Sequence, residues 1–158
     1  MALCIERANA YFVNFQGIGI GEVARLAADG VKVIVLEIHA ETTSEKVAMG
    51  RLLDGRVALV VGTHTHVQTA DETIFPGGTG YLTDAGMCGP EESVLGRSIE
   101  SVVWRFKTGM PTRFPIAKGG VRLCGVVVDV DTECGRCLTI RRLSLQVPVA
   151  AEVAQATV

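Results

Sequence analysis

Two short apolar runs rich in β-branched residues constrain the fold of this chain more than any other feature. They are VKVIVLEI at 31–38 and VALVVG at 57–62. Runs of this length without polar alternation are typical of strands buried on both faces, as in a parallel sheet covered by helices. Between them, TTSE at 42–45 offers a helix cap and DG at 54–55 a stop. The pattern predicts a strand–helix–strand unit.

Further elements are expected on either side of this unit. The spacing of apolar residues predicts strands at 11–15 and 80–83, and helices at 22–28 and about 94–107. Residues 121–131 alternate as a strand and 136–145 return as its antiparallel partner, which predicts a hairpin at the sheet edge. We therefore expect an α/β fold in a single domain spanning 1–158, with a frayed tail over 147–158.

Composition narrows the class of protein. Hydrophobic residues make up 48% and charged residues 20% of the 158 residues, as in globular domains with one core. A net charge of -2 argues against a surface organised around a nucleic-acid backbone, so stable binding to duplex nucleic acid is not expected.

Location and redox state are also predicted from composition. The apolar runs are far shorter than the roughly 20 residues that cross a bilayer, and the amino terminus lacks the pattern of a secretory signal. The five cysteines are an odd number at irregular spacings, unlike a disulfide framework. We expect a cytoplasmic protein with reduced thiols and no membrane contact.

All three histidines follow predicted strands, His39 in EIHAE and both His64 and His66 in GTHTH. Taken singly, each could merely satisfy a hydrogen bond. Their concentration at strand ends, where α/β sheets place chemistry, instead favours a metal site built from imidazoles. Glu41 is expected to cap or support the following helix, and Glu37 to orient His39, rather than to bind metal.

Other chemistries match less well. HAE at 39–41 and CGRC at 134–137 superficially resemble the zinc deaminase pattern H-x-E…P-C-x-x-C. Glu133 stands where the proline belongs, however, and two surface cysteines in a turn are the favoured interpretation. The chain contains neither G-x-S-x-G nor a phosphate-binding loop, and GIG at 17–19 lacks the third glycine of a dinucleotide site. Metal-based hydrolysis is therefore the first hypothesis. A zinc-dependent deaminase ranks third, after the non-catalytic alternative described below.

Five collinear segments carry a family resemblance: EIHAETTSEK, DGRVALVVGTHTHVQTAD, GTGYLTDAGMCGP, RFKTGMPTRF and GVVVDVD. They resemble the carboxyl-terminal portion of the YmdB-type, calcineurin-like bacterial metallophosphoesterases. The resemblance runs from about Val31 to Leu145, whereas residues 1–30 match poorly or suggest a deletion. It implies part of that family's α/β/β/α sandwich, ending in a carboxyl-terminal antiparallel hairpin.

The resemblance also implies a function. Such enzymes use a binuclear site of two divalent metal ions, iron or manganese, to hydrolyse phosphodiesters that include 2′,3′-cyclic nucleotides. By this resemblance His39 and His64 would bind one metal and His66 the other, while Thr63 and Thr65 would shape the loop. No residue of this chain is assigned as catalytic.

The remaining family ligands are not found in this sequence. In the family an aspartate, a bridging glutamate, an asparagine and an Asn-His pair lie in the amino-terminal half, and no G-D-x-x-G or G-N-H segment occurs here. The chain is therefore expected to be an incomplete phosphodiesterase, active only if another chain or an upstream segment supplies the missing ligands. A complementing amino-terminal half and a homo-oligomer are the expected partners. The alternative is a non-catalytic remnant or interaction module that keeps the fold.

Overall fold

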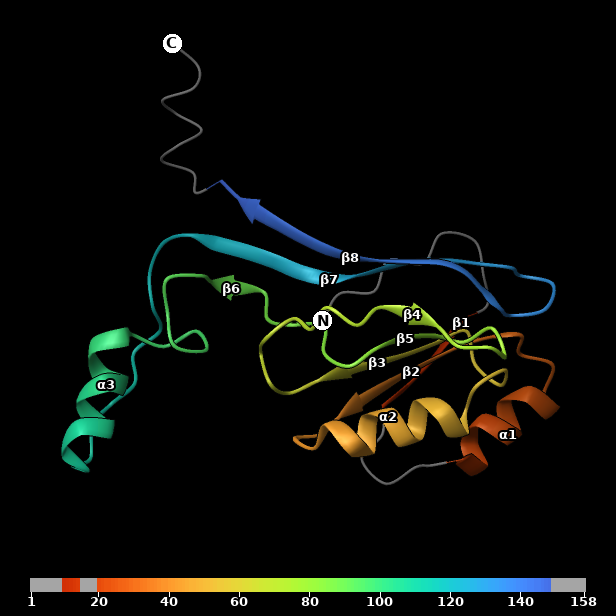
Figure 1. Ribbon diagram of the computed structural model, residues 1–158, viewed down its shortest axis with the longest axis horizontal. Coiled ribbons are helices and arrows are strands. Elements are labelled where there is room, and N and C mark those ends of the chain that lie inside the picture. Colours follow the sequence, from red (N-terminus) through yellow and green to blue (C-terminus); the bar gives the residue numbers. More distant parts are fainter. Residues whose placement is uncertain (1–9, 15–19, 149–158) are drawn as a thin grey trace, which may run out of the picture. The chain divides into compact units, whose positions relative to one another are not determined.

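A computed structural model describes residues 10–14 and 20–148 of the chain (Figure 1). The elements are β1 (Ala10–Asn14), α1 (Ile20–Ala28), β2 (Val33–His39), α2 (Thr43–Leu52), β3 (Leu59–Thr63), β4 (Thr73–Ile74), β5 (Gly80–Leu82), β6 (Gly89–Pro90), α3 (Ile99–Thr108), β7 (Val121–Val130) and β8 (Cys137–Val147). Within these described ranges, no helix has both the length and the apolar character needed to cross a membrane. Most of the tail expected to fray, from 149 onward, lies outside the described residues.

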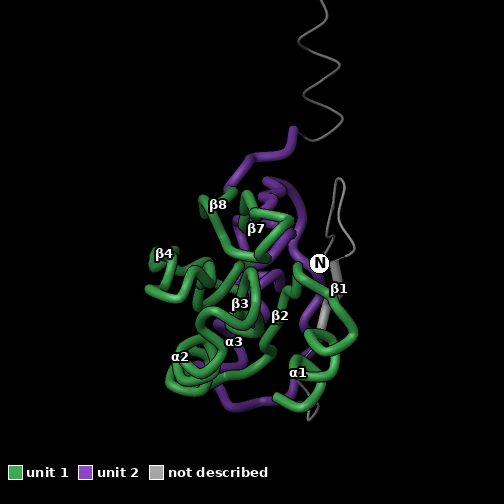
Figure 2. The backbone as a smooth tube through the Cα atoms, turned by 90° about the vertical axis from the view of Figure 1, so that its right-hand side faces the viewer, with its two compact units in different colours: residues 1–86, 125–143 green, residues 87–124, 144–158 purple. Residues whose placement is uncertain are grey.

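The chain divides into two compact units (Figure 2). The first unit comprises 1–86 and 125–143, and the second comprises 87–124 and 144–158. All three histidines belong to the first unit. The expectation that the whole chain behaves as a single domain stays a prediction.

The first unit contains a five-stranded sheet in the order β1-β2-β3-β5-β4. Strands β1, β2, β3 and β5 pair in parallel, and the two-residue β4 pairs antiparallel with β5. In the β2–β3 register His39 lies opposite Thr63, so both strands end at the same edge of the sheet. The α/β fold class predicted from the apolar runs is confirmed.

Both faces of this sheet are covered, which explains why its strands show no polar alternation. Figure 1 shows α1 and α2 along one face. There the core contains Val23 and Leu26 of α1 with alternate strand residues such as Ile34 and Val60. On the other face, Val35, Leu59, Val61, Leu82 and Ala85 pack against Val126, Val128 and Ile140 of β7 and β8.

The carboxyl-terminal hairpin is antiparallel as predicted, but its place differs from the prediction. Strands β7 and β8 belong to a separate three-stranded sheet in the order β6-β7-β8, not to the edge of the first sheet. Val126 and Val128 pack face-on against the buried strands, while the short β4 occupies that edge. Alternation along a strand indicates one buried face, and it cannot distinguish edge pairing from face packing.

Two helix starts also differ in detail from the sequence prediction. Helix α3 begins at Ile99 because the preceding residues form a turn, with Leu95 at φ 51° and Gly96 at φ 89°. Thr42 precedes α2 in extended conformation without a side-chain cap hydrogen bond. The TTSE segment therefore marks the helix start correctly, although its hydroxyls do not cap it in the usual way.

Gly62 on β3 permits a close approach between two segments of the first unit. A Cβ atom at this position would lie 1.8 Å from the carbonyl oxygen of Thr83 and 2.8 Å from Cδ of Lys46. The carbonyl of Gly62 also accepts a hydrogen bond from the amide of Ala85 at 2.9 Å. Only a residue without a side chain fits here.

Gly62→Ala is expected to lower the free energy of unfolding by about 3 kcal/mol or more, because the clash is with backbone that must shift. The matched control is Gly21→Ala in α1, where nothing lies within 4 Å of the new Cβ. That change should leave stability unchanged or raise it by about 0.5–1 kcal/mol, since alanine favours helix. Urea unfolding of both variants measures the difference, and equal stabilities would contradict this account.

Candidate metal centre

The structure brings His39 and His64 into contact at the end of β2 and β3. Their ring centroids are 4.7 Å apart with the planes at 87°. Nδ1 of His64 lies 3.0 Å from Nε2 of His39. The sequence placed these residues after neighbouring parallel strands, and the shared sheet edge accounts for their meeting.

A hydrogen-bond chain holds the ring of His39. The hydroxyl of Thr63 donates to Glu37 Oε1 at 2.8 Å, and the same oxygen lies 3.0 Å from Nδ1 of His39. A carboxylate only accepts, so the hydroxyl hydrogen points to Glu37 and the oxygen must accept from Nδ1. The lone pair of Nε2 is then turned toward His64. Glu37 thus orients His39 through Thr63, a relay that residue spacing alone did not reveal.

A second carboxylate holds His64. Its Nε2 lies 2.8 Å from Oε2 of Glu41, whose side chain is 81% exposed. The sequence predicted that Glu41 caps or supports α2, but the structure pairs it with His64 instead. Because the carboxylate can only accept, Nε2 of His64 carries a hydrogen and Nδ1 is the nitrogen directed at His39.

The backbone of the histidine loop, residues 63–66, is strained. His64 has φ 103° and His66 has φ 65°, in the left-handed region that residues other than glycine rarely occupy. Each such conformation costs about 1–3 kcal/mol and persists only where the surroundings enforce it, most often at functional sites. The strain therefore supports the interpretation of this loop as part of a site.

The chain following the loop is fixed on the side of β7 and β8. The side-chain nitrogen Nε2 of Gln68 donates to the carbonyls of Gly125 at 2.9 Å, Leu143 at 3.0 Å and Ala85 at 3.3 Å. Gln68 therefore ties this segment to both strands of the hairpin. These hydrogen bonds anchor the chain shortly after His64.

His66 lies on the same loop and is exposed. Across residues 10–14 and 20–148, no group of three or more His, Cys, Asp or Glu side chains is placed to hold a metal ion. The structure therefore assembles a pair of imidazoles from the three predicted ligands, with His66 two residues further along. The deaminase pattern gains no support either. Cys134 is exposed in the β7–β8 turn, whereas Cys137 is buried, so the prediction of two surface cysteines is wrong for Cys137.

The His39–His64 pair suits a transition-metal ion. Imidazole nitrogens bind such ions at about 2.0–2.1 Å, so two nitrogens at right angles around one ion are about 3 Å apart. The measured separation of Nε2 and Nδ1 is 3.0 Å. The donor atoms and their spacing thus fit two adjacent ligands of one ion.

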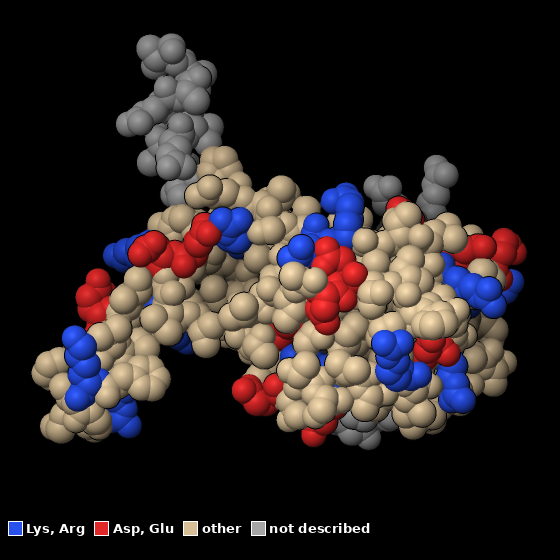
Figure 3. Space-filling view, viewed as in Figure 1, with Lys and Arg blue, Asp and Glu red and all other residues tan. Residues whose placement is uncertain are grey.

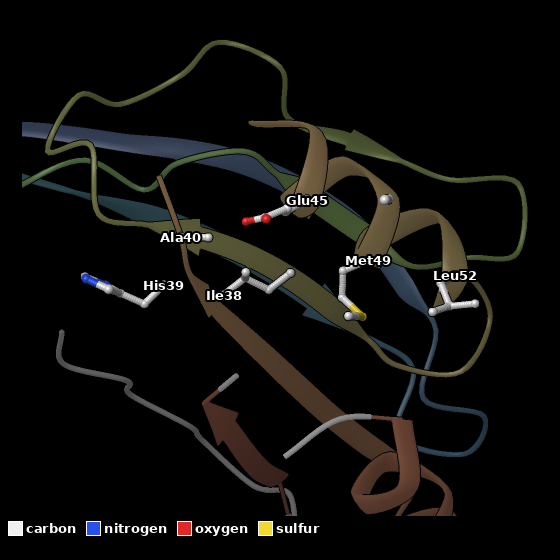
Figure 4. Close-up of a pocket in the computed structure, with 7 residues that line it drawn as sticks. Ile38, His39, Ala40, Glu45, Met49 and Leu52 are labelled. Atoms are coloured by element: carbon white, nitrogen blue, oxygen red, sulfur yellow. The ribbon is translucent and has the colours of Figure 1, made fainter. Parts of the chain in front are cut away.

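A cavity of about 510 Å³ lies beside His39 in the first unit. Figure 4 shows the ring of His39 at one end of it and Met49 and Leu52 of α2 at the other. Its lining consists of Ile38, His39, Ala40, Glu45, Ala48, Met49 and Leu52. His39 therefore borders open, mostly apolar space instead of packed core.

Comparisons with known proteins identify sequences and structures that this chain resembles. A family profile described as YmdB-like protein matches residues 18–143. A 2′,3′-cyclic-nucleotide 2′-phosphodiesterase from Bacillus subtilis (strain 168) is 48% identical over 122 residues, which cover 77% of this chain and 46% of that protein. A putative phosphatase/phosphodiesterase from Mycoplasma pneumoniae is 46% identical over 98 residues, 61% of this chain and 35% of that protein. The chain spans less than half the length of these relatives.

Two crystal structures share the fold. A hypothetical protein from Thermus thermophilus superposes with a TM-score of 0.79 at 36% identity, covering 92% of this chain and 61% of that one. A phosphatase from Mycoplasma pneumoniae gives a TM-score of 0.79 at 30% identity, covering 98% and 59%. The fold described above is thus shared with a phosphatase structure.

Thr63→Val should release the ring of His39, because it removes the hydroxyl that links Nδ1 to Glu37. We expect the hydrogen of His39 to redistribute between Nδ1 and Nε2, which long-range proton–nitrogen NMR spectra of the imidazole measure. Thr43→Val, at an exposed position in the first turn of α2, is the control. An unchanged His39 ring signal in Thr63→Val would contradict the relay.

Asp84 should respond to acid in a defined direction. Burial of its carboxyl opposes ionisation, but hydrogen bonds from Lys46 and from the amides of Gly86 and Thr65 outweigh it and lower the pKa of Asp84 below its ordinary 3.8. The ionised group thus contributes stability that is complete above that pH and lost as pH falls through the lower folded-state pKa.

By carboxyl carbon NMR, more than half of Asp84 should therefore still be in the charged form when the folded protein is taken down to pH 3.8. Urea unfolding should show stability decreasing more steeply below that pH in the wild type than in Asp84→Asn. Glu92→Gln, which removes an exposed carboxylate, is the control. A titration midpoint of Asp84 above pH 3.8 in the folded protein would refute the assignment.

Proposed function

The chain belongs to the YmdB-like protein family, and from that premise we propose that it provides the histidine ligands of a metal-dependent phosphodiesterase. The observation that carries the proposal is the convergence of His39 Nε2 and His64 Nδ1, 3.0 Å apart. The names of its relatives support phosphoric ester hydrolysis as the reaction class. A purely structural role would not require two nearby residues of one loop to adopt left-handed backbone conformations.

In this proposal His39 and His64 bind one divalent cation and His66 a second, with iron or manganese as the candidate metals. When bound, such ions neutralise the charge of the phosphate and generate hydroxide near neutral pH. The protein groups do the positioning. Glu37 acts through Thr63 on His39, and Glu41 acts on His64, so that each ring presents a fixed nitrogen.

Two nearby carboxylates are already engaged in this positioning. Glu37 accepts from Thr63, and Glu41 pairs with His64 Nε2, on the side of the ring away from His39. Two divalent ions need further oxygen ligands to offset their charge. We propose that these ligands come from a complementing amino-terminal segment additional to the 158 residues, and that the complete assembly acts on 2′,3′-cyclic nucleotides in the cytoplasm.

One observation favours a second candidate, an interaction module. In the second unit, every residue from 103 to 116 is exposed, including Trp104 at 54% and Phe106 at 84%. Figure 3, in the view of Figure 1, shows mostly uncharged surface over α3, with basic side chains along it and an acidic group at one end. If His64→Ala and His66→Ala changed no measurable property while the chain still formed a defined oligomer, this candidate would be preferred.

The test of the first proposal is metal content together with hydrolysis of bis-p-nitrophenyl phosphate. The chain is mixed with the amino-terminal half of the Bacillus subtilis relative and with Mn²⁺ or Fe²⁺. We expect hydrolysis, and we expect His39→Ala or His64→Ala to reduce its rate about 100-fold or more. Cys134→Ala, an exposed position in the β7–β8 turn, is the control and should reduce the rate less. Absence of both bound metal and hydrolysis in the mixture would exclude the proposal.

A further inference from the structure

Lys46 and Asp84 form an ion pair in the interior of the first unit. Their side chains are 1% and 0% exposed, and Nζ lies 2.9 Å from Oδ2 of Asp84. Lysine is almost never fully buried unless it is paired. Nζ also donates to the carbonyl of Thr63 at 2.7 Å. The pair thus joins α2, the end of β3 and the segment after β5.

The hydrogen bonds of this pair lie on both sides of His64. Lys46 holds the carbonyl of Thr63, which belongs to the peptide group before His64. Oδ2 of Asp84 accepts from the amide of Thr65, at 3.0 Å, in the peptide group after it. The orientations of these two peptide planes define φ and ψ of the residue between them. The ion pair therefore enforces the φ of 103° at His64.

Asp84 is itself held from the other side. Its Oδ1 accepts from the amide of Gly86 at 3.0 Å, and its own amide donates to the hydroxyl of Thr69 at 2.9 Å. Both carboxylate oxygens are thus engaged, and the carboxylate has little freedom to move. This rigidity is transmitted to the amide of Thr65 and so to the ring of His64.

We propose that Lys46 and Asp84 are positioning residues of the histidine site, which set its affinity for a transition-metal cation by fixing the backbone of His64. The inference rests on the proposed function for its metal, but its geometric part stands independently. Stability alone does not account for the pair, because well-packed apolar residues often replace a buried ion pair without loss. What they cannot replace is the pair of hydrogen bonds that flank His64.

The experiment compares Lys46→Met/Asp84→Asn with Leu53→Ala. The double variant removes both charges while nearly keeping side-chain volume. Leu53, 1% exposed, belongs to the helix-side core and immediately follows α2, so its truncation weakens the same region without removing a bond to the histidine loop. The first readout is Co²⁺ affinity, followed by visible absorption. The second, without metal, is the NMR cross-relaxation between the rings of His39 and His64.

We expect the double variant to bind Co²⁺ at least about tenfold more weakly than the wild type and to lose the contact between the rings. Leu53→Ala should keep both within about twofold of the wild type, because it leaves every bond to the histidine loop in place. If the double variant fails to fold, Lys46→Gln replaces it, because glutamine keeps a donor but its side chain is too short to hold both Asp84 and Thr63.

Two results would overturn the inference. One is a folded Lys46 variant that retains the contact between the rings and the wild-type Co²⁺ affinity. The other is Leu53→Ala losing the contact as completely as the Lys46 variant does. If the wild type bound no Co²⁺ even when mixed with the amino-terminal half of the Bacillus subtilis relative, the proposed function would fail, whereas the ring contact would still decide whether Lys46 and Asp84 position His64.

Discussion

The arrangement of the histidine site depends on one close contact, between the end of β3 and the segment that follows β5. Gly62 lets the backbone of Thr83 approach where any side chain would clash, and Lys46 and Asp84 complete the contact with charge and hydrogen bonds. The contact lies just before the point where the chain leaves the sheet. The backbone that leads into His64 is therefore held in place by this contact.

Local sequence patterns predicted the parts of this structure that depend on local chemistry. The run at 31–38 became β2, the run at 57–62 became β3, and His39 and His64 met because parallel strands end together. The place of the hairpin was not predictable, since alternating residues along β7 would look the same at a sheet edge and over its face. That choice is made by long-range packing of Val126 and Val128.

The positioning residues were harder to recognise for a related reason. Lys46 follows Glu45 in a sequence typical of a solvated helix face, and nothing local indicates that its ammonium group is buried against Asp84, 38 residues away. Glu41 precedes a helix, where acidic residues usually stabilise the first turn, so its contact with His64 was missed. Thr63 was assigned to loop shape, although its hydroxyl is the link between Glu37 and His39.

The strained loop is held from both faces of the first sheet, and this bears on how a metal site could be shared between polypeptide segments. Lys46 reaches it from the helix layer, while Gln68 secures the following residues to β7 and β8. A segment that supplied the missing carboxylates would thus meet imidazoles already oriented, and their ordering would add little to the entropic cost of assembly. If these hydrogen bonds did not hold the two histidines, the metal ion would have to order them on binding, which would lower the affinity of the site for the metal. This accounts for a charged pair buried beneath an exposed loop. Its hydrogen bonds to Thr63 and Thr65 hold the loop in a strained backbone conformation that the loop would otherwise leave.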